Sequence, residues 1–373
     1  MPRLPSNVSI DRQDWRLLPS EEVLWYGRPE AVGYDRRWTL VPLFLLGTAL
    51  IFGAFAGLVW VADLPGAGRV GSFAIFLALF AATVRLAPKF LIDPCEYLVT
   101  NKRVFFRRGA YRRSMERHAV NYARIRWHRS APGVGHLELV RAVPFGPLAR
   151  QMRIQLLNVQ APDAVYATIR DAEQSEHAGD NQVPLIERLE PGENVVWGAH
   201  PEGLHLGWRE VAIALLGVAM LVVAGRYLLL AGGELVNLED LGLATNSWTW
   251  AFFFLAVAIT WSLLIAVGAG LLWYGVWRAR SLGASTEYLL TDRRLLIRRG
   301  LTELSVDRKC IVDVAHTRTF RGLHHVFLVL DAPNSRALAD SGALNTLLPA
   351  RDAVGPVLYE LRDVDGFRAV LQL

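Results

Sequence analysis

The side chains best able to do chemistry in this chain are arginines gathered in two segments, one in each half of the sequence. The candidates are Arg103, Arg107, Arg108, Arg293, Arg294, Arg298 and Arg299. A guanidinium group presents a rigid fork of donors that suits phosphate or carboxylate oxygens. These residues therefore predict contact with anionic lipid headgroups or with an acidic partner. The alternative interpretation is a solvated basic hairpin that binds no ligand.

Three histidines, His316, His324 and His325, also lie close together in the sequence. A metal site would need a further ligand at suitable geometry and outer groups that orient the ring nitrogens. We therefore expect no metal ion and no cofactor. The chain also lacks a P-loop, an HExxH helix and a GxSxG elbow. We predict on this basis that it is not an enzyme.

The elements that must position these residues occur twice in the sequence. Residues 17–30 return without a gap as residues 189–202, which places Trp25 and Trp197 at the same point of the two motifs. Residues 96–103 return as residues 287–294, with the shared pattern Glu-Tyr-Leu-x-Thr-(Asn/Asp)-x-Arg. Such self-similarity predicts a duplicated unit. We expect the two tryptophans to be interfacial or packing anchors rather than residues that stack on a ligand.

Long apolar stretches separate the two motifs of each copy. A helix of about 20 apolar residues spans the roughly 30 Å of hydrocarbon in a bilayer. We therefore predict four transmembrane helices, arranged as two hairpins, over residues 39–62, 70–87, 209–231 and 249–277.

The orientation of these hairpins follows from the basic residues that flank them. Arginines and lysines cluster before and after each hairpin, whereas the loop inside the second hairpin carries Glu234, Glu239 and Asp240. The positive-inside rule then predicts that both termini and both large domains are cytoplasmic. We expect no signal peptide, because residues 1–38 lack an apolar core followed by a cleavage site.

After each hairpin the apolar residues alternate with polar ones, which predicts β-strands. A helical pattern closes each copy, near residues 162–169 and 365–373. The predicted organisation is an N-terminal segment, a hairpin and a β-rich domain, then a linker, a second motif, a second hairpin and a second β-rich domain. The boundaries are residues 1–38, 39–88, 89–173, 174–188, 189–208, 209–277 and 278–373.

The apolar hairpin followed by the Thr-(Asn/Asp)-x-Arg motif resembles the bacterial pleckstrin-homology-like domain of membrane-flanked proteins. The resemblance covers roughly residues 17–173 and 189–373. It implies an α+β membrane protein in which each transmembrane hairpin precedes a pleckstrin-homology-like barrel, or curled sheet, with a C-terminal helix. It also implies no enzymatic activity and a location in the bacterial inner membrane. Residues 331–354 depart from the first copy as a longer loop.

Three functions are compatible with this organisation. The first is a non-catalytic scaffold whose tandem cytoplasmic domains bind other membrane or cytoplasmic proteins, and we favour it. The second is a sensor of anionic lipid surfaces, and the third is a component of a transporter. We expect no nucleic-acid partner. The two β-rich domains can pack on each other, or each can copy a homo-oligomer contact, and the sequence leaves both possibilities open.

Overall fold

The computed structural model describes residues 11–30, 36–61, 67–143, 150–202, 208–240, 247–318, 322–331 and 357–371. Within these ranges the chain is an α+β protein, with helices and three β-sheets. We define residues 11–171 as the first unit and residues 185–371 as the second unit. Predicted features in the ranges that are left out, including most of the 331–354 loop, lie outside the described residues.

The helices and strands follow one another in the same order in both units. The first unit contains β1 (Val23–Gly27), α1 (Arg36–Val61), α2 (Ala67–Leu91), β2 (Cys95–Thr100), β3 (Arg103–Arg108), β4 (Tyr111–Glu116), β5 (Tyr122–Trp127), β6 (Val134–Val143), β7 (Arg150–Gln160) and α3 (Pro162–Arg170). The second contains β8 (Val195–Ala199), α4 (Trp208–Asp240), α5 (Ser247–Ala284), β9 (Thr286–Thr291), β10 (Arg294–Arg299), β11 (Thr302–Asp307), β12 (Ile311–Arg318), β13 (His324–Leu330), β14 (Val357–Leu361) and α7 (Val364–Leu371).

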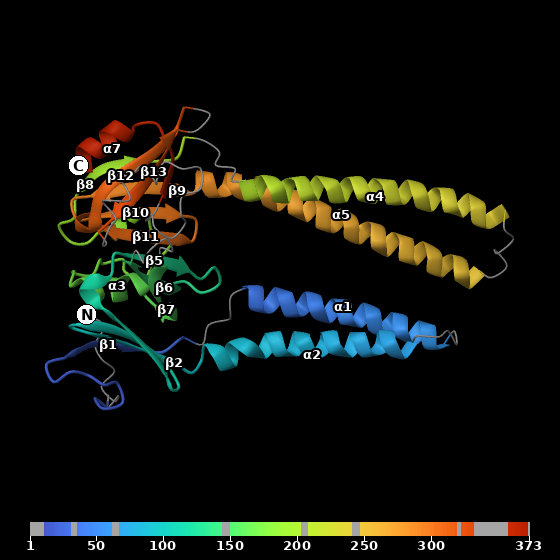
Figure 1. Ribbon diagram of the computed structural model, residues 1–373, viewed down its shortest axis with the longest axis horizontal. Helices are drawn as coiled ribbons and strands as arrows, with labels where there is room; N and C mark the ends of the chain where they lie inside the picture. Colours follow the sequence, from blue (N-terminus) through green and yellow to red (C-terminus); the bar gives the residue numbers. More distant parts are fainter. Residues whose placement is uncertain are drawn as a thin grey trace.

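The helices α1 and α2 form a pair that extends away from the β-sheets (Figure 1). The stretches Thr39–Gly57 and Gly68–Leu91 have mean hydropathies of 2.1 and 2.0 and are long enough to cross a membrane. Few of their residues are buried within the chain, and the alanines Ala56 and Ala74 are among those that are. A largely apolar, outward-facing helix pair is the arrangement expected for association with lipid.

The helices α4 and α5 form a second pair that extends to the same side as the first (Figure 1). These helices cover the predicted third and fourth spans. Their apolar stretches among the described residues are shorter, at Val211–Tyr227 and Trp261–Trp277. The helix α4 continues past the predicted end of the third span at residue 231, as far as Asp240. Leucine and glutamate after the glycine pair favour helix and outweigh the cost of the glycines.

Two glycines bring α4 and α5 into close contact. A Cβ atom at Gly217 would lie 2.7 Å from the main-chain nitrogen of Leu272 and 2.8 Å from the carbonyl oxygen of Gly268. A Cβ atom at Gly268 would lie 3.1 Å from the carbonyl oxygen of Gly217. Small residues of this kind let the backbones of two apolar helices approach each other.

The strands form a four-stranded sheet, β1-β2-β3-β4, a three-stranded sheet, β12-β13-β14, and a seven-stranded sheet, β7-β6-β5-β11-β10-β9-β8. The seven-stranded sheet contains strands of both units, because β5 of the first unit pairs with β11 of the second. The sequence left open whether the two β-rich domains pack together, and the structure joins them through this strand pair.

Each unit has its own hydrophobic core between its strands and its closing helix. Tyr97 is fully buried in the first core, and its hydroxyl accepts a hydrogen bond from the Leu157 N–H at 2.8 Å. Tyr288 is 1% exposed in the second core, and its hydroxyl accepts from the Tyr359 N–H at 3.0 Å. Buried tyrosines bring a large apolar surface and need such a partner for the hydroxyl. The two cores are therefore anchored in the same way.

The close contact between α4 and α5 leaves no space for a larger side chain at Gly217. We expect Gly217→Leu to lower the thermal stability of the detergent-solubilised protein, because the new side chain meets backbone atoms of α5. Overpacking of this kind costs about 1–3 kcal/mol. The matched control is Gly270→Leu, because an added Cβ at Gly270 meets nothing within 4 Å. Equal melting temperatures for the two variants would contradict the close contact.

Candidate functional site

A buried carboxylate holds the N-terminal motif against the hairpin that follows α2. Glu21 is 1% exposed. It accepts hydrogen bonds from Thr100 Oγ1 at 2.8 Å and from Arg103 Nε and Nη2 at 3.0 and 2.7 Å. The Leu18 N–H donates to the same carboxylate at 2.9 Å. We define Glu21, Thr100 and Arg103 as the first clamp.

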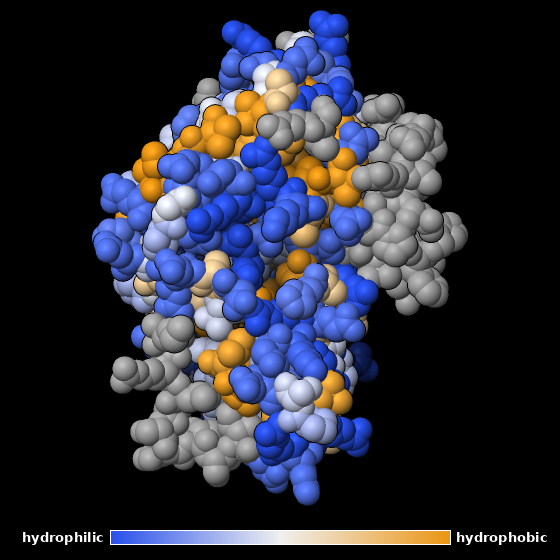
Figure 2. Space-filling model, turned by 90° about the vertical axis from the view of Figure 1, so that its left-hand side faces the viewer, coloured by the Kyte–Doolittle hydropathy of each residue, from blue (hydrophilic) through white to orange (hydrophobic). Residues whose placement is uncertain are grey.

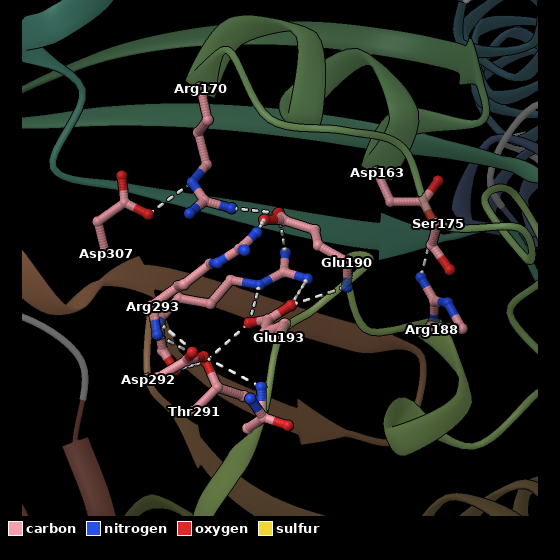
Figure 3. A network of polar contacts seen from close by, with 12 residues as sticks. Asp163, Arg170, Ser175, Arg188, Glu190, Glu193, Thr291, Asp292, Arg293 and Asp307 are labelled. Carbon is pink, nitrogen blue, oxygen red and sulfur yellow. Dashed lines mark hydrogen bonds and ion pairs between the residues drawn. The ribbon is translucent and has the colours of Figure 1, made fainter.

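The second unit contains the same arrangement, which we define as the second clamp. Glu193 accepts from Thr291 Oγ1 at 2.7 Å and from Arg294 Nε and Nη2, both at 2.9 Å. The Glu190 N–H donates to it at 2.8 Å. Figure 3 shows Glu190 and Glu193 of the motif before α4 close to Thr291 of the hairpin after α5. The predicted site residues Arg103 and Arg294 are therefore partners of buried carboxylates.

Burial and hydrogen bonding act in opposite directions on the clamp carboxylates. Burial of Glu21 raises the pKa of its carboxyl group, but the bonds from Arg103, Leu18 and Thr100 outweigh it and lower the pKa to about 2. Burial likewise raises the pKa of Glu193, and the Arg294 guanidinium shifts it to a net lower value. Both groups are therefore ionised at neutral pH and act as structural ion pairs rather than as general acids.

Further ion pairs cross from the closing helix of the first unit to the second unit. Arg170 at the end of α3 lies 2.5 Å from Glu190 and 2.5 Å from Asp307 (Figure 3). Arg188 lies 2.9 Å from Asp163 in α3 and 2.6 Å from Glu303 in β11. The side chains of Arg188 and Glu303 are only 5% and 8% exposed. This network supports the β5–β11 pair from the side of α3.

The two arginine-rich hairpins each have an end near the helices and an end far from them. Arg108 pairs with Cys95, which follows shortly after α2 ends at Leu91. Arg299 pairs with Thr286, which follows shortly after α5 ends at Ala284. Arg103 and Arg294 lie at the opposite ends, about 17 Å away at 3.3 Å per residue. The predicted basic residues therefore do not form one continuous rim.

Several of the predicted arginines are held by other parts of the chain. Arg107 Nη1 lies 3.2 Å from the Asp14 carboxylate. Arg298 Nη2 donates to the Asn181 carbonyl at 2.8 Å. Arg293 lies at the far end of its hairpin, with a side chain that is 44% exposed. Each of these three arginines therefore either binds another part of the chain or lies far from the helices.

Arg108 and Arg299 are the predicted cations best placed to meet a ligand next to the helices. Arg108 is exposed at the tip of the β3–β4 hairpin. Arg299 is partly exposed, and its guanidinium carbon lies 5.6 Å from the centre of the Tyr359 ring. The stacked ring fixes the position of this charge without neutralising it.

The tryptophans of the two motifs pack inside the β-sheet units. Trp25 lies in β1 and packs against the first core. Trp197 lies in β8 and packs against the second core, with its ring centre 4.8 Å from that of Phe367. Both rings therefore contribute to the packing of their units.

The three clustered histidines make separate contacts. His316 and His324 meet edge to face with ring centres 5.1 Å apart. His325 Nδ1 instead accepts a hydrogen bond from the Glu360 N–H at 3.3 Å. In the described parts of the chain, no three His, Cys, Asp or Glu side chains are placed to hold one metal ion.

The clamp residues Glu21, Thr100, Glu193 and Thr291 were not among the predicted site residues. Their signal was present in the sequence, since each glutamate and each threonine recurs at the same place of its repeated motif. What the sequence did not reveal is that the two motifs touch, because α1 and α2, or α4 and α5, separate them along the chain.

Comparisons with protein-family models, with curated proteins and with solved structures find no match for this chain.

Removing the arginine of the second clamp tests its structural role. We expect Arg294→Ala to destabilise the protein by about 3–5 kcal/mol, because it leaves a buried carboxylate without its partner. The matched control is the neighbouring Arg293→Ala, which should cost less than about 1 kcal/mol because its side chain is 44% exposed and its ion pair with Glu190 is long, at 3.6 Å. Thermal unfolding in detergent measures both. Similar losses for the two variants would show that Glu193 does not depend on Arg294.

The depressed pKa of Glu21 predicts a loss of stability in acid. The stabilisation is fully present above the unperturbed pKa of 4.5 and is lost as the pH falls toward the folded value of about 2. Glu21→Gln should therefore flatten the dependence of unfolding on pH in this window. The control Glu22→Gln alters an exposed neighbour and should leave the wild-type slope unchanged. An unchanged slope in Glu21→Gln would refute the assignment.

Proposed function

We propose that this chain is a non-catalytic integral protein of the bacterial inner membrane, built from two copies of one unit. Each copy contributes a transmembrane hairpin, so four helices cross the membrane. In support, α1 and α2 are long and apolar enough to do so, and α4 and α5 hold the same place in the second unit. Each unit then has strands and a closing helix that suit a pleckstrin-homology-like domain.

The proposed orientation places both β-rich domains and both termini in the cytoplasm. Basic residues flank the ends of the helix pairs that meet the sheets, as the positive-inside rule requires. The face of the sheets turned away from the helices is mostly hydrophilic, with smaller hydrophobic areas (Figure 2). Such a face is suited to the cytoplasm and to contact with soluble partners.

We favour a scaffold that binds other proteins, and the observation that carries this proposal is the seven-stranded sheet shared by both units. Main-chain pairing of β5 with β11, together with the ion pairs of Arg170 and Arg188, couples the two domains. Flexibly linked domains would bind partners independently. Coupled domains instead present two surfaces at a fixed spacing, which suits the organisation of partners beside the membrane.

The second candidate function is recognition of an anionic lipid surface. Each cation near such a surface contributes about 1 kcal/mol, and the attraction fades within a Debye length of about 8 Å. Arg103, Arg293 and Arg294 lie beyond that distance if the helix ends mark the surface. Arg108 and Arg299 lie close to it. The resulting attraction of about 2 kcal/mol is weak, so we rank this function below the scaffold.

Photo-crosslinking in cells separates the two functions. A crosslinkable amino acid replaces Arg108, Arg299 or, as a control at the far end of its hairpin, Asp292 in otherwise wild-type protein. The scaffold predicts that at least one of these positions crosslinks reproducibly to the same protein. A protein product from the probe at position 292 should be unchanged by Arg108→Ala with Arg299→Ala.

The lipid sensor makes the opposite prediction for the same probes. Anionic lipid should be the main product at positions 108 and 299, with little at position 292. A crosslinkable residue at Lys89, close to the helix end, should then lose its lipid product when both arginines become alanine. If lipid products that depend on both arginines form and no protein product does, the lipid sensor is the correct function and the scaffold is wrong.

A further inference from the structure

The joint between the two units is an antiparallel pair of strands that belong to different units. Thr302 lies opposite Arg126, and the pairing continues to Val306 opposite Tyr122. The Trp127 N–H adds a hydrogen bond to the Leu301 carbonyl at 2.9 Å. The joint therefore uses the fourth strand of the second unit and the fifth strand of the first.

Each strand of the joint has an equivalent in the other unit. The equivalent of β11 in the first unit is β4, and the equivalent of β5 in the second unit is β12. β4 leads into the short helix Arg117–Ala119, as β11 leads into Arg308–Cys310, and β5 and β12 follow these helices. Among the strands that the structure describes, β4 pairs only with β3, and β12 pairs only with β13. Each thus has one edge that is not part of a described sheet.

The exposure of the side chains differs between β11, which is paired on both sides, and β4, which is paired on one side. Glu303 and Ser305 of β11 are 7% and 6% exposed, because β5 and the linker cover them. The corresponding residues of β4 are Arg112, which is exposed, and Ser114, which is half-buried. An uncovered strand edge is a template for pairing with another chain.

The charges at the two free edges complement each other. In the internal joint, Arg188 bridges Asp163, the second residue of α3, and Glu303 of β11. The second residue of α7 is Asp365, which is exposed and acts electrostatically on His316 of β12. Arg368 of α7 acts on His316 more strongly than Asp365 does and lies at the same edge. Arg112 takes the place of Glu303 on β4, so its guanidinium would meet the Asp365 carboxylate once Arg368 has moved away from the edge.

From this equivalence we infer that β4 of one copy of the chain pairs with β12 of a second copy, in the manner of β11 with β5. By the internal register, Arg113 lies opposite Ala315, as Leu304 lies opposite Arg124. Arg112 lies opposite His316, beside Asp365. In the single chain the Val314 carbonyl accepts from Arg368 at 2.5 Å, and the Val314 N–H donates to Asp313 Oδ1 at 2.7 Å. Both side chains give way to the incoming strand.

This contact is head to tail, so it closes into a ring or continues as a filament. Both helix pairs extend to the same side of the sheets (Figure 1). The rotation that relates the two units of one chain, and by equivalence two neighbouring copies, therefore runs about an axis along the helices. Successive copies therefore stay in one layer, as a ring or as a row. The strand contact does not depend on the proposed membrane location, whereas the layer of copies would be the membrane plane.

Cysteine pairs test the contact in native membranes of the full-length protein. In a Cys310→Ser background, Arg113→Cys with Ala315→Cys should form disulfides between copies on mild oxidation, giving multiples of the chain on a non-reducing gel. Leu304→Cys with Arg124→Cys, the internal equivalent, should link within one chain. Tyr111→Cys with Asp313→Cys is four residues out of register and should give little product. The inference is overturned if the internal pair closes while Arg113→Cys with Ala315→Cys yields no more than the out-of-register pair.

A charge exchange tests the same contact without relying on cysteine geometry alone. Added to the Arg113→Cys and Ala315→Cys pair, Arg112→Asp should lower the yield of linked copies about fivefold, as expected for loss of an ion pair at an exposed contact. Adding Asp365→Arg should restore it. The variants are compared only when their melting temperatures in detergent agree. Equal yields in all three backgrounds would show that β4 does not meet α7 and β12, and would overturn the assigned contact.

Discussion

The structure depends on one interaction, made once in each unit, between a buried glutamate and the arginine of the hairpin turn. A carboxylate such as Glu21 cannot be buried without opposite charge and hydrogen bonds, because the desolvation of an ion is costly. Arg103, Thr100 and a main-chain N–H satisfy it from two sides. The result pins β1 to β2 and β3 although the helix pair lies between them in the chain. Each helix pair is thereby attached to its sheet at both of its ends.

The second constraint is the coupling of the two units through β5 and β11. A strand pair supplies directional main-chain hydrogen bonds. The buried ion pair of Arg188 and Glu303 further restricts how the two units can be placed relative to each other. Each unit keeps its own hydrophobic core, yet Tyr122 of β5 belongs to the core of the second unit. Independent movement of the two domains would therefore break both the sheet and a core. This stiffness gives the protein a fixed spacing between the surfaces of its two β-rich domains.

The arginines show how tertiary structure divides residues that look alike in sequence. Arg107 and Arg108 are adjacent, but one lies against Asp14 and the other is exposed at the hairpin tip. Arg294 and Arg299 lie on one strand, but the first neutralises Glu193 and the second stands beside the end of α5. Side-chain alternation and strand length decide these roles. Of the seven predicted arginines, only Arg108 and Arg299 stand exposed or partly exposed beside the helix ends without an ion pair to another part of the described chain.

The amino-acid sequence by itself determined the local elements. Period-two alternation predicted the strands around Tyr97 and Tyr288, and continuous apolar runs predicted α1 and α2 with small errors at their ends. These properties depend on neighbours along the chain, so spacing is enough to reveal them. Only the tertiary structure decided that Glu21 meets Arg103 and that β5 joins β11, because both contacts link residues far apart in sequence. Their energy comes from burial and from main-chain pairing, which exist only when the chain has folded.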